Sequence, residues 1–484
     1  MRRRGLAFAL IFIFALGVFV SGGIYLWAAA RAYTLTGEVY LGERGDASGL
    51  GLTQETVLSR HLDWQTDYDA GSGGAETGAS WSLARREIGE EAAPPSLTLE
   101  GVGFEYSERW YGLDRHTAGL PFAQGILDGI YDMLGGAPGQ RRVKLSIGDY
   151  MDSVPLRFAC QGLSISAPSG GDYAYGRVPL DVFGLPIGEK AYFDAYLSLN
   201  STASTFKLWA SSGETYDVSS DCVFAADSCL YLVLDVRTKA THSSPAALAD
   251  GSALPGGGWG VYRIPCSFAD GAPDGERWWV SGGYEVAPDF SAVENIYPLG
   301  DSWGGAALGL SYDGTRLLLF TAGEALTLTV IDLASGDTVQ QMELLSGPED
   351  YILDVWLDWD SFSAFDGGYA LAIGSSVLYA LEQDGLYGRA QTISLAQAPM
   401  PGQRDGSCSI STLDFEACGG NLAILESGLY MSERSENYLR LTLYSAEGEC
   451  IYAEWITPPL AGMYGSHRQQ TDYDFKRTET EAVS

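Results

Sequence analysis

The clearest hydrophobic pattern in this chain of 484 residues lies between Gly309 and Leu344. Residues 326–330 alternate leucine or valine with threonine, the period of two that predicts a strand. Residues 316–320 and 338–344 are further apolar or alternating stretches on either side. Asp-Gly and Ser-Gly turn pairs separate the three segments. The pattern therefore predicts three consecutive antiparallel strands with tight turns.

Weaker copies of the strand, glycine turn and strand arrangement occur elsewhere. They are 206–209 with Gly213 and Tyr216, 377–381 with Gly385 and Tyr387, and 439–443 with Gly448 and 450–455. The turn glycines Gly336, Gly385 and Gly448 lie 49 and 63 residues apart. Periods of about 40–50 residues with four strands each are typical of propeller blades.

The region 33–150 has a less regular pattern. Its expected elements are strands at 39–41, 61–68 and 143–147 and a helix at 121–134. The helix is predicted from apolar residues at four-residue spacing, and the pair Gly135-Gly136 ends it.

The segment Ser311-Tyr312-Asp313-Gly314-Thr315-Arg316-Leu317, with Leu328–Val339 after it, resembles one blade of the YVTN/WD40-like β-propeller superfamily. Such blades pair an S-x-D-G-x-x-L inner hairpin with a V-I-D-L-x-x-G outer hairpin. The resemblance implies a mostly β exported domain of about six to eight irregular blades. The alternative is a β-sandwich over 33–200 followed by a smaller propeller.

The N-terminus predicts a membrane anchor. Arg2, Arg3 and Arg4 precede 5–30, twenty-six residues without a charge. As a helix this run is ~39 Å long, which is enough to cross a ~30 Å hydrocarbon core. The basic cluster places the N-terminus in the cytoplasm and everything after about residue 31 outside. A secretory signal peptide cleaved near Ala28-Ala29-Ala30 is the alternative. This layout resembles single-pass, membrane-anchored surface proteins of bacteria.

The expected organisation has five parts. They are a cytoplasmic basic stub at 1–4, a transmembrane helix at 5–30, an irregular β-rich region at 33–150, propeller-like repeats at 151–458, and a polar, disordered tail at 459–484.

Charge narrows the choice of partners. The formal net charge is −33, with 62 acidic against 29 basic residues. A nucleic-acid binder needs a cationic surface, so DNA and RNA are excluded as partners. Self-repulsion that keeps an exported domain soluble explains the charge better than a store of carboxylates for Ca²⁺.

Seven cysteines are compatible with an exported chain. The local pairs Cys222/Cys229 and Cys408/Cys418 are the expected disulfides, since each would close a short loop. The odd count leaves at least one thiol unpaired within the chain.

Candidate catalytic and metal-binding residues do not form a recognised motif. The acidic cluster is Asp354, Asp358, Asp360 and Asp366, and a second one is Asp63, Asp67 and Asp69. Both lack the spacing of a calcium loop and are interpreted as solvated loops. The scattered histidines are His61, His116, His242 and His467. Nucleophile-elbow and phosphate-loop motifs are absent from the sequence. No catalytic, cofactor-binding or metal-binding residue is assigned, and no cofactor is expected.

Aromatic residues are the remaining binding candidates. Those beside turns or glycines are Trp278, Trp279, Trp303, Tyr173 and Tyr175. We therefore expect a non-enzymatic, membrane-anchored binding platform whose partner is a protein or a cell-wall glycan. The alternatives are an exported hydrolase or lyase with a carboxylate site on the propeller axis, and a structural scaffold of a membrane complex.

Overall fold

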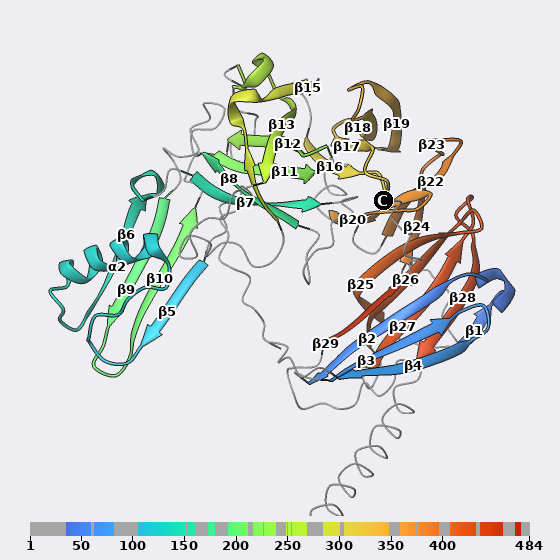
Figure 1. The fold of residues 1–484 in the computed structure, drawn as a ribbon, viewed down its shortest axis with the longest axis horizontal. Helices are drawn as coiled ribbons and strands as arrows, with labels where there is room; N and C mark the ends of the chain where they lie inside the picture. Colours follow the sequence, from blue (N-terminus) through green and yellow to red (C-terminus); the bar gives the residue numbers. More distant parts are fainter. Residues whose placement is uncertain are drawn as a thin grey trace, which may run out of the picture. The chain divides into compact units, whose positions relative to one another are not determined.

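The structure of this chain is a computed structural model, and it is built mostly from β-strands (Figure 1). It describes residues 35–59, 62–81, 105–150, 153–160, 173–179, 192–211, 216–225, 227–238, 248, 250–252, 254–268, 284–300, 304–347, 359–373, 376–395, 407–431, 436–457 and 470–475. Two compact units divide the chain. Unit 1 joins 1–89 to 359–484, and unit 2 is 90–358.

Unit 1 contains three antiparallel sheets. The first has the order β1 (Thr36–Leu41), β28 (Cys450–Thr457), β27 (Glu436–Tyr444), β26 (Asn421–Met431) and β25 (Ser407–Cys418). The second has the order β29 (Gln470–Phe475), β2 (Gly51–Ser59), β3 (Leu62–Asp69) and β4 (Gly74–Trp81). The third has the order β20 (Trp359–Phe365), β21 (Gly368–Ile373), β22 (Ser376–Gln383) and β23 (Leu386–Tyr387), with β24 (Gln391–Ser394) also paired to β22. A short 3₁₀ helix, η1 (Arg44–Ala47), follows β1.

The five-stranded sheet of unit 1 is buried on both faces. Leu441 of β27 belongs to a core that also contains Leu52 of β2 and Tyr68 of β3. Ile424 of β26 belongs to a second core that contains Tyr379 of β22. A strand buried on both sides needs apolar residues at successive positions, which explains why β26 reads Leu-Ala-Ile-Leu at 422–425.

The two ends of unit 1 are paired in the sheets, which differs from the expected organisation. β1 pairs with β28, and β29 pairs with β2. The strand 470–475 therefore lies inside the tail expected to be disordered, and Phe475 is buried. Its mostly polar sequence gives no clear local strand signal, and pairing with the distant strand β2 stabilises it. The alternative of a separate sandwich over 33–200 is wrong, because β1 and β2–β4 pair with C-terminal strands.

Unit 2 contains three sheets and one α-helix. The first sheet has the order β5 (Glu105–Trp110), β10 (Ser204–Ser211), β9 (Tyr192–Leu199) and β6 (Gly139–Ser146). The second has the order β12 (Cys229–Thr238), β11 (Tyr216–Phe224), β7 (Ser153–Cys160), β8 (Tyr173–Pro179), β14 (Tyr284–Pro288), β13 (Gly260–Phe268) and β15 (Glu294–Pro298), with β12 also paired to β13. The third has the order β16 (Gly305–Leu310), β17 (Arg316–Ala322), β18 (Ala325–Asp332) and β19 (Thr338–Ser346). The helix is α2 (Pro121–Met133), and the 3₁₀ turns are η2 (Ile147–Asp149), η4 (Pro255–Gly257) and η5 (Phe290–Ala292).

The third sheet of unit 2 confirms the strands predicted at 309–344. Its strands follow one another in sequence and pair antiparallel. At the β16–β17 turn, the Asp313 Oδ1 atom accepts hydrogen bonds from the Ser311 hydroxyl at 2.6 Å and the Thr315 amide at 3.1 Å. Gly314 takes a φ of 68°, which a side chain disfavours. Burial alone would raise the pKa of Asp313, but these hydrogen bonds lower it. The predicted S-x-D-G turn is therefore a closed hydrogen-bonded loop.

Two of the three weaker copies are also hairpins. β22 and β23 pair across Asp384-Gly385, whose φ angles of 52° and 80° suit a two-residue hairpin turn. β27 and β28 pair before and after Gly448. The copy at 206–216 is wrong, because β10 pairs with β5 and β9 and leaves no edge for β11. β10 and β11 belong to two different sheets.

The predicted helix at 121–134 is confirmed as α2. Ile126 and Ile130 are buried, and Pro121 occupies the first turn, where its missing N–H costs nothing. Gly135 and Gly136 follow with φ angles of 60° and 68°. Within the described part of the chain, no helix has the length and apolarity needed to cross a membrane. The predicted span at 5–30 lies outside the described residues.

Neither predicted disulfide is present, since Cys222, Cys229 and Cys418 are free thiols. Cys222 and Cys229 belong to different cores on opposite faces of the β11–β12 hairpin, so their thiols point apart. Cys408 and Cys418 lie in the same strand, β25, where ten residues span about 33 Å. The segment expected to form a short loop between these two cysteines is a continuous strand.

Candidate functional site

A pocket opens where two sheets of unit 2 separate. One wall is the face of β17 and β18 that carries Leu317, Leu319 and Ile331. These residues pack with Val261 of β13 and form a closed apolar core. Further along the same face, Thr321, Thr327 and Thr329 replace the leucines. All three threonines line the pocket. The sheet face therefore changes from a packed core to a polar wall along its length.

The second wall comes from β15 and the residues that follow it. Tyr297, Pro298 and Leu299 line the pocket on this side. The Leu299 amide donates a hydrogen bond of 2.8 Å to the carbonyl of Trp259, which fixes this segment against β13. The pocket is open to solvent and has a volume of about 350 Å³, within the range of small-molecule sites. A rigid strand end thus places an aromatic ring opposite the threonines.

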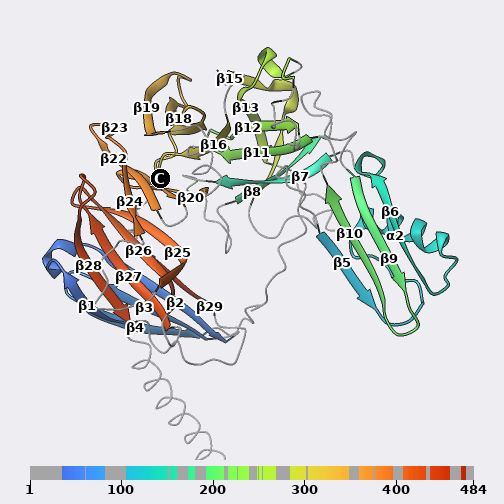
Figure 2. The same cartoon turned by 180° about the vertical axis from the view of Figure 1, so that it is seen from behind.

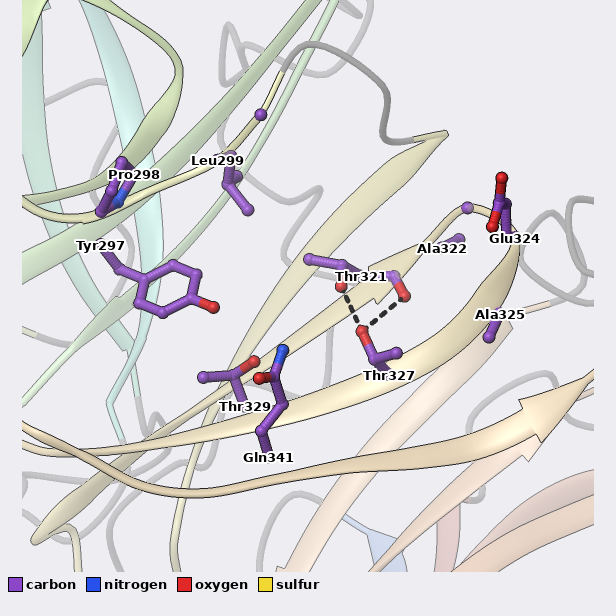
Figure 3. Close-up of a pocket in the computed structure, with 12 residues that line it drawn as sticks. Tyr297, Pro298, Leu299, Thr321, Ala322, Glu324, Ala325, Thr327, Thr329 and Gln341 are labelled. Atoms are coloured by element: carbon purple, nitrogen blue, oxygen red, sulfur yellow. Dashed lines mark hydrogen bonds between the residues drawn. The ribbon is translucent and has the colours of Figure 1, made fainter.

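Figure 3 shows how the polar groups of the pocket differ in their bonding. The Thr321 and Thr327 hydroxyls share a hydrogen bond of 2.6 Å. The register places Thr329 beside Gln341 of β19. Among the described residues, no side-chain hydrogen bond satisfies the Thr329 hydroxyl, the Gln341 amide or the Tyr297 hydroxyl. Thr329 is only 2% exposed, and its side chain lines the pocket.

These polar groups can bond a ligand in the pocket. A typical hydrogen bond contributes about 0.5–1.5 kcal/mol net. A hydroxyl or carbonyl group of a ligand can bond the Thr329 hydroxyl and the Gln341 amide at the same time, because the two residues are in register. Gln341 is itself exposed, so the group is accessible from the open side. The pocket can therefore recognise a small polar molecule.

The lining residues favour a neutral ligand. Glu324 is the one charged side chain among them, at the two-residue β17–β18 turn. The set holds no cation to pair with an anionic ligand. It also holds no serine, cysteine or histidine arranged as nucleophile and base. Hydroxyl, amide and aromatic groups together suit hydrogen bonding to a polyol and contact with its apolar faces.

The predicted acidic residues do not form a site in the described residues. Asp69 accepts hydrogen bonds from the Ser72 hydroxyl at 2.8 Å and the Gly71 amide at 2.9 Å, and these lower its pKa. It therefore caps the β3–β4 turn. Asp366 is exposed at the β20–β21 turn. No group of three metal-ligating side chains occurs in the described part of the chain. Asp354 and Asp358 lie outside the described residues, and Asp63 and Asp360 lie in strands without described side chains.

His116 is the described member of the predicted histidine set. Its ring stacks on Trp110 at 5.1 Å, and its Nε2 atom lies 3.4 Å from the Glu108 carboxylate. This arrangement fixes the loop between β5 and α2. The remaining histidines lie outside the described residues: His61, His242 and His467. Of the aromatic candidates, Trp278, Trp279 and Trp303 also lie outside them, and Tyr173 and Tyr175 lie in β8 without described side chains.

Two carboxylates of unit 1 are fully buried but serve the core. The Glu454 carboxylate lies 2.9 Å from the Arg44 guanidinium and accepts hydrogen bonds from the hydroxyls of Tyr68 at 2.6 Å and Tyr452 at 2.8 Å. Burial, followed by the hydrogen bond to Glu454, raises the pKa of Tyr68 to about 12.

The second buried carboxylate, Glu426, bonds Arg440 at 2.6 Å and also accepts from the Tyr438 hydroxyl. Burial would lower the pKa of Arg440, but the Glu426 carboxylate offsets this and the net pKa is raised. Glu426 is in register with Arg440, whereas Glu454 is in register with Leu441, the next residue of β27. The two carboxylates therefore face opposite sides of the sheet and do not converge.

Sequence reasoning did not select Tyr297, Thr329 or Gln341. The available signal was the threonine at every second position of 327–329, because a strand buried on both faces rarely carries polar residues there. The identity of the opposite wall depends on long-range pairing, which the pattern alone does not reveal.

Comparisons with known proteins add little. No family model matches the chain, and no curated protein matches it. Among solved structures, the Cps50 (Swd1) β-propeller domain of Myceliophteria thermophila is 8% identical, with 54% of this chain and 89% of that chain covered and a TM-score of 0.22. Hsv2 of Kluyvelomyces marxianus is 7% identical, with 48% and 59% covered and a TM-score of 0.18. The dihydro-heme d1 dehydrogenase NirN is 11% identical, with 87% and 75% covered and a TM-score of 0.23. Likenesses this weak carry no information about function.

Proposed function

We propose that this chain is a membrane-anchored, extracytoplasmic binding protein of irregular β-propeller architecture, and that it holds a neutral polyhydroxylated ligand in the unit 2 pocket. A glycan of the cell wall is the natural class. The observation that carries the proposal is the set of polar side chains that line the pocket and make no side-chain hydrogen bond among the described residues: Tyr297, Thr329 and Gln341.

The proposed architecture draws on the stacking of the sheets. In unit 1 the five-stranded sheet contributes to one core with the β2–β4 sheet and to another with the β20–β24 sheet. In unit 2 the β16–β19 sheet shares a core with β11–β13. Sheets buried through stacking on both faces are what radial blades require. The export and the anchor rest on Arg2–Arg4 and the uncharged run 5–30.

The alternatives find less support. A carboxylate hydrolase needs two acids that converge, and Glu426 and Glu454 lie on opposite sheet faces. A scaffold needs a continuous apolar patch, whereas within the described residues the large exposed apolar side chains lie on separate elements. They are Tyr111, Met133, Tyr312, Val339 and Leu386.

The test uses calorimetric titration of the full chain, purified in a neutral detergent, with chitotriose as a neutral N-acetylated glycan probe. Gln341→Ala and Thr329→Val should each lower the affinity about tenfold, the effect of losing one well-made hydrogen bond. Gln340→Ala is the matched control, because this neighbour points to the other face of β19, and it should leave the affinity within about twofold.

Three outcomes decide the proposal. Binding that falls with Gln341→Ala and survives Gln340→Ala supports the pocket. Equal losses from both variants would place the ligand elsewhere and overturn it. The absence of binding to chitotriose and to a panel of neutral hexose oligomers would also overturn it.

A further inference from the structure

The first sheet of unit 2 has two unlike faces. α2 lies along one of them (Figures 1 and 2). Phe193 and Leu197 of β9 are buried on that side, where the ring of Phe122 stacks on Phe193 at 5.5 Å. The burial along β9 alternates strictly, so the residues between these positions point to the other face.

The second face collects cations and aromatic rings. Register places side chains of β6, β9 and β10 together on it. Its members are Arg142, Lys144, Tyr192, Asp194, Tyr196, Lys207 and Trp209. We call this set the cationic face. Lys144 and Lys207 are two of only five lysines in a chain of net charge −33.

Contacts on the cationic face hold the charges in place. The Lys144 ammonium lies 4.3 Å from the centroid of the Tyr192 ring. Arg142 and Lys207 lie 5.8 Å and 5.6 Å from the centroid of the Trp209 ring. Cation–aromatic contacts of this length are attractive. The aromatic rings therefore act as a rigid support that spaces the three cations.

Two acidic residues balance part of this charge. Glu105 of β5 is in register with Trp209, and Asp194 bonds a cation directly. Arg142 donates to Asp194 through Nε at 2.7 Å and also through Nη2. The Arg142 side chain remains 67% exposed, so it is open to solvent. Arg109 is a further exposed cation, in register with Thr205 at the edge of the same face. The face is thus locally positive although the chain is strongly acidic.

The spacing of the cations suits a polymer with repeated charges. Arg142 and Lys144 are two positions apart on β6, about 7 Å. Lys207 lies two strands away, about 10 Å across the sheet. A single phosphate spans neither distance. Amide and hydroxyl groups in the next row of the same face, on Gln140 and Ser198, can bond the hydroxyls of a sugar.

The sheet face also selects against an extended peptide. An added peptide strand needs the free N–H and C=O groups of a sheet edge. In the middle of the sheet those groups already pair β9 with β6 and with β10. A polysaccharide has no backbone amides to satisfy, and its ring faces can lie on Trp209 and Tyr196.

We infer that the cationic face binds an anionic polysaccharide, with Arg142, Lys144 and Lys207 pairing its carboxylates and the aromatic rings contacting its sugars. This site is separate from the pocket for a neutral ligand and does not depend on it. The remaining negative charge of the chain repels a polyanion only weakly at 0.15 M salt, where the screening length is about 8 Å.

The test immobilises polygalacturonate and measures binding of the full chain in neutral detergent at 0.15 M salt. The double variant Arg142→Gln/Lys144→Gln should weaken binding at least about tenfold, since charge-assisted hydrogen bonds contribute most of it. Lys207→Gln, on another strand, should weaken it by a smaller factor. Arg141→Gln is the matched control. It removes one positive charge from the same strand, as each half of the double variant does, but Arg141 pairs with Leu197 on the other face, so binding should stay within about twofold.

Ligand controls separate charge from sugar. Methyl-esterified polygalacturonate has the same rings without the charges and should not bind. Polyglutamate has the charges without the rings and should bind about tenfold more weakly. Equal binding of either control, an equal loss from Arg141→Gln, or no binding of polygalacturonate by the unaltered chain would overturn the inference.

Discussion

Polar side chains face the space between stacked sheets in two regions of this molecule, and they are treated in opposite ways. In unit 1, Glu454 lies between the five-stranded sheet and β3, bonded to Arg44, Tyr68 and Tyr452. In unit 2, Thr329 of β18 lines the pocket opposite β15. Its hydroxyl makes no side-chain hydrogen bond among the described residues. The first group is sealed by internal bonds, and the second is open.

The difference helps to distinguish polar side chains that stabilise the fold from those that can bind a ligand. A buried charge is tolerable only if it is paired and hydrogen-bonded. Unit 1 meets this condition at both Glu454 and Glu426, so its polar groups fix the register of the sheets. The polar groups of the unit 2 pocket have no such internal bonds at Thr329 and Gln341, so they stay available to a ligand. Polar side chains that line a cavity without internal bonds are therefore candidates for ligand binding.

The largest expected loss of stability comes from removing one partner of a buried ion pair in unit 1. Arg440→Met leaves the buried Glu426 carboxylate without its cation, which should destabilise unit 1 by about 3–5 kcal/mol. Hydrogen exchange of the β26–β28 amides, read by mass spectrometry, measures the loss locally. The double variant Glu426→Leu/Arg440→Met should recover most of the stability. If the double variant were as unstable as the single one, the pair would not be the cause.

A smaller effect on stability is expected when one tyrosine hydroxyl is removed from each region in turn. Tyr68→Phe removes a hydroxyl that bonds both Glu454 and Arg44, and it should cost about 1.5–3 kcal/mol. Tyr297→Phe removes a hydroxyl from the pocket and should change the stability by less than about 0.5 kcal/mol. Urea unfolding of the full chain, followed by exchange in each unit, gives both numbers. Equal costs would mean that the pocket is sealed like the core of unit 1.

Close approach at a glycine offers the next test. A Cβ atom on Gly37 would lie 2.0 Å from the Glu454 Oε1 atom and 2.1 Å from the Tyr68 hydroxyl oxygen. Gly37→Ala should therefore push the sealed group apart and cost about 1–3 kcal/mol. Gly45→Ala, in η1, is the control because nothing lies within 4 Å of its added Cβ atom. Thermal unfolding compares the two, and a harmless Gly37→Ala would refute the tight contact.

Sequence patterns predicted local elements well in both units. The alternation at 326–330, the Asp-Gly turn at 313–314 and the helix 121–134 all hold. Each depends on contacts within a few residues, so the local pattern contains the information. The tail strand β29 and the pairing of β1 with β28 were not predicted, because their partners lie about four hundred residues away along the chain.

The candidate site was harder to predict for the same reason. Thr329 and Gln341 lie on adjacent strands of a predicted hairpin, yet Tyr297 comes from another sheet and faces them only after packing. The disulfide hypotheses failed because sequence proximity ignores strand direction. Cys222 and Cys229 are close in number but lie on opposite faces.

The smallest expected effect is the response of the sealed group to alkaline pH. The pKa of Tyr68 is raised from its ordinary 10.0 to about 12, first by burial and then by the hydrogen bond to Glu454. A raised pKa means that the folded state holds the proton more tightly than the unfolded chain. The stabilisation is therefore complete below pH 10 and is lost as the pH rises through 12. The free energy of unfolding of unit 1 should fall between pH 10 and pH 12. Tyr68→Phe should flatten that slope and Tyr297→Phe should not, because only the former removes the titrating group of the sealed core. A slope that Tyr68→Phe leaves unchanged would assign the alkaline loss to other groups of the unit.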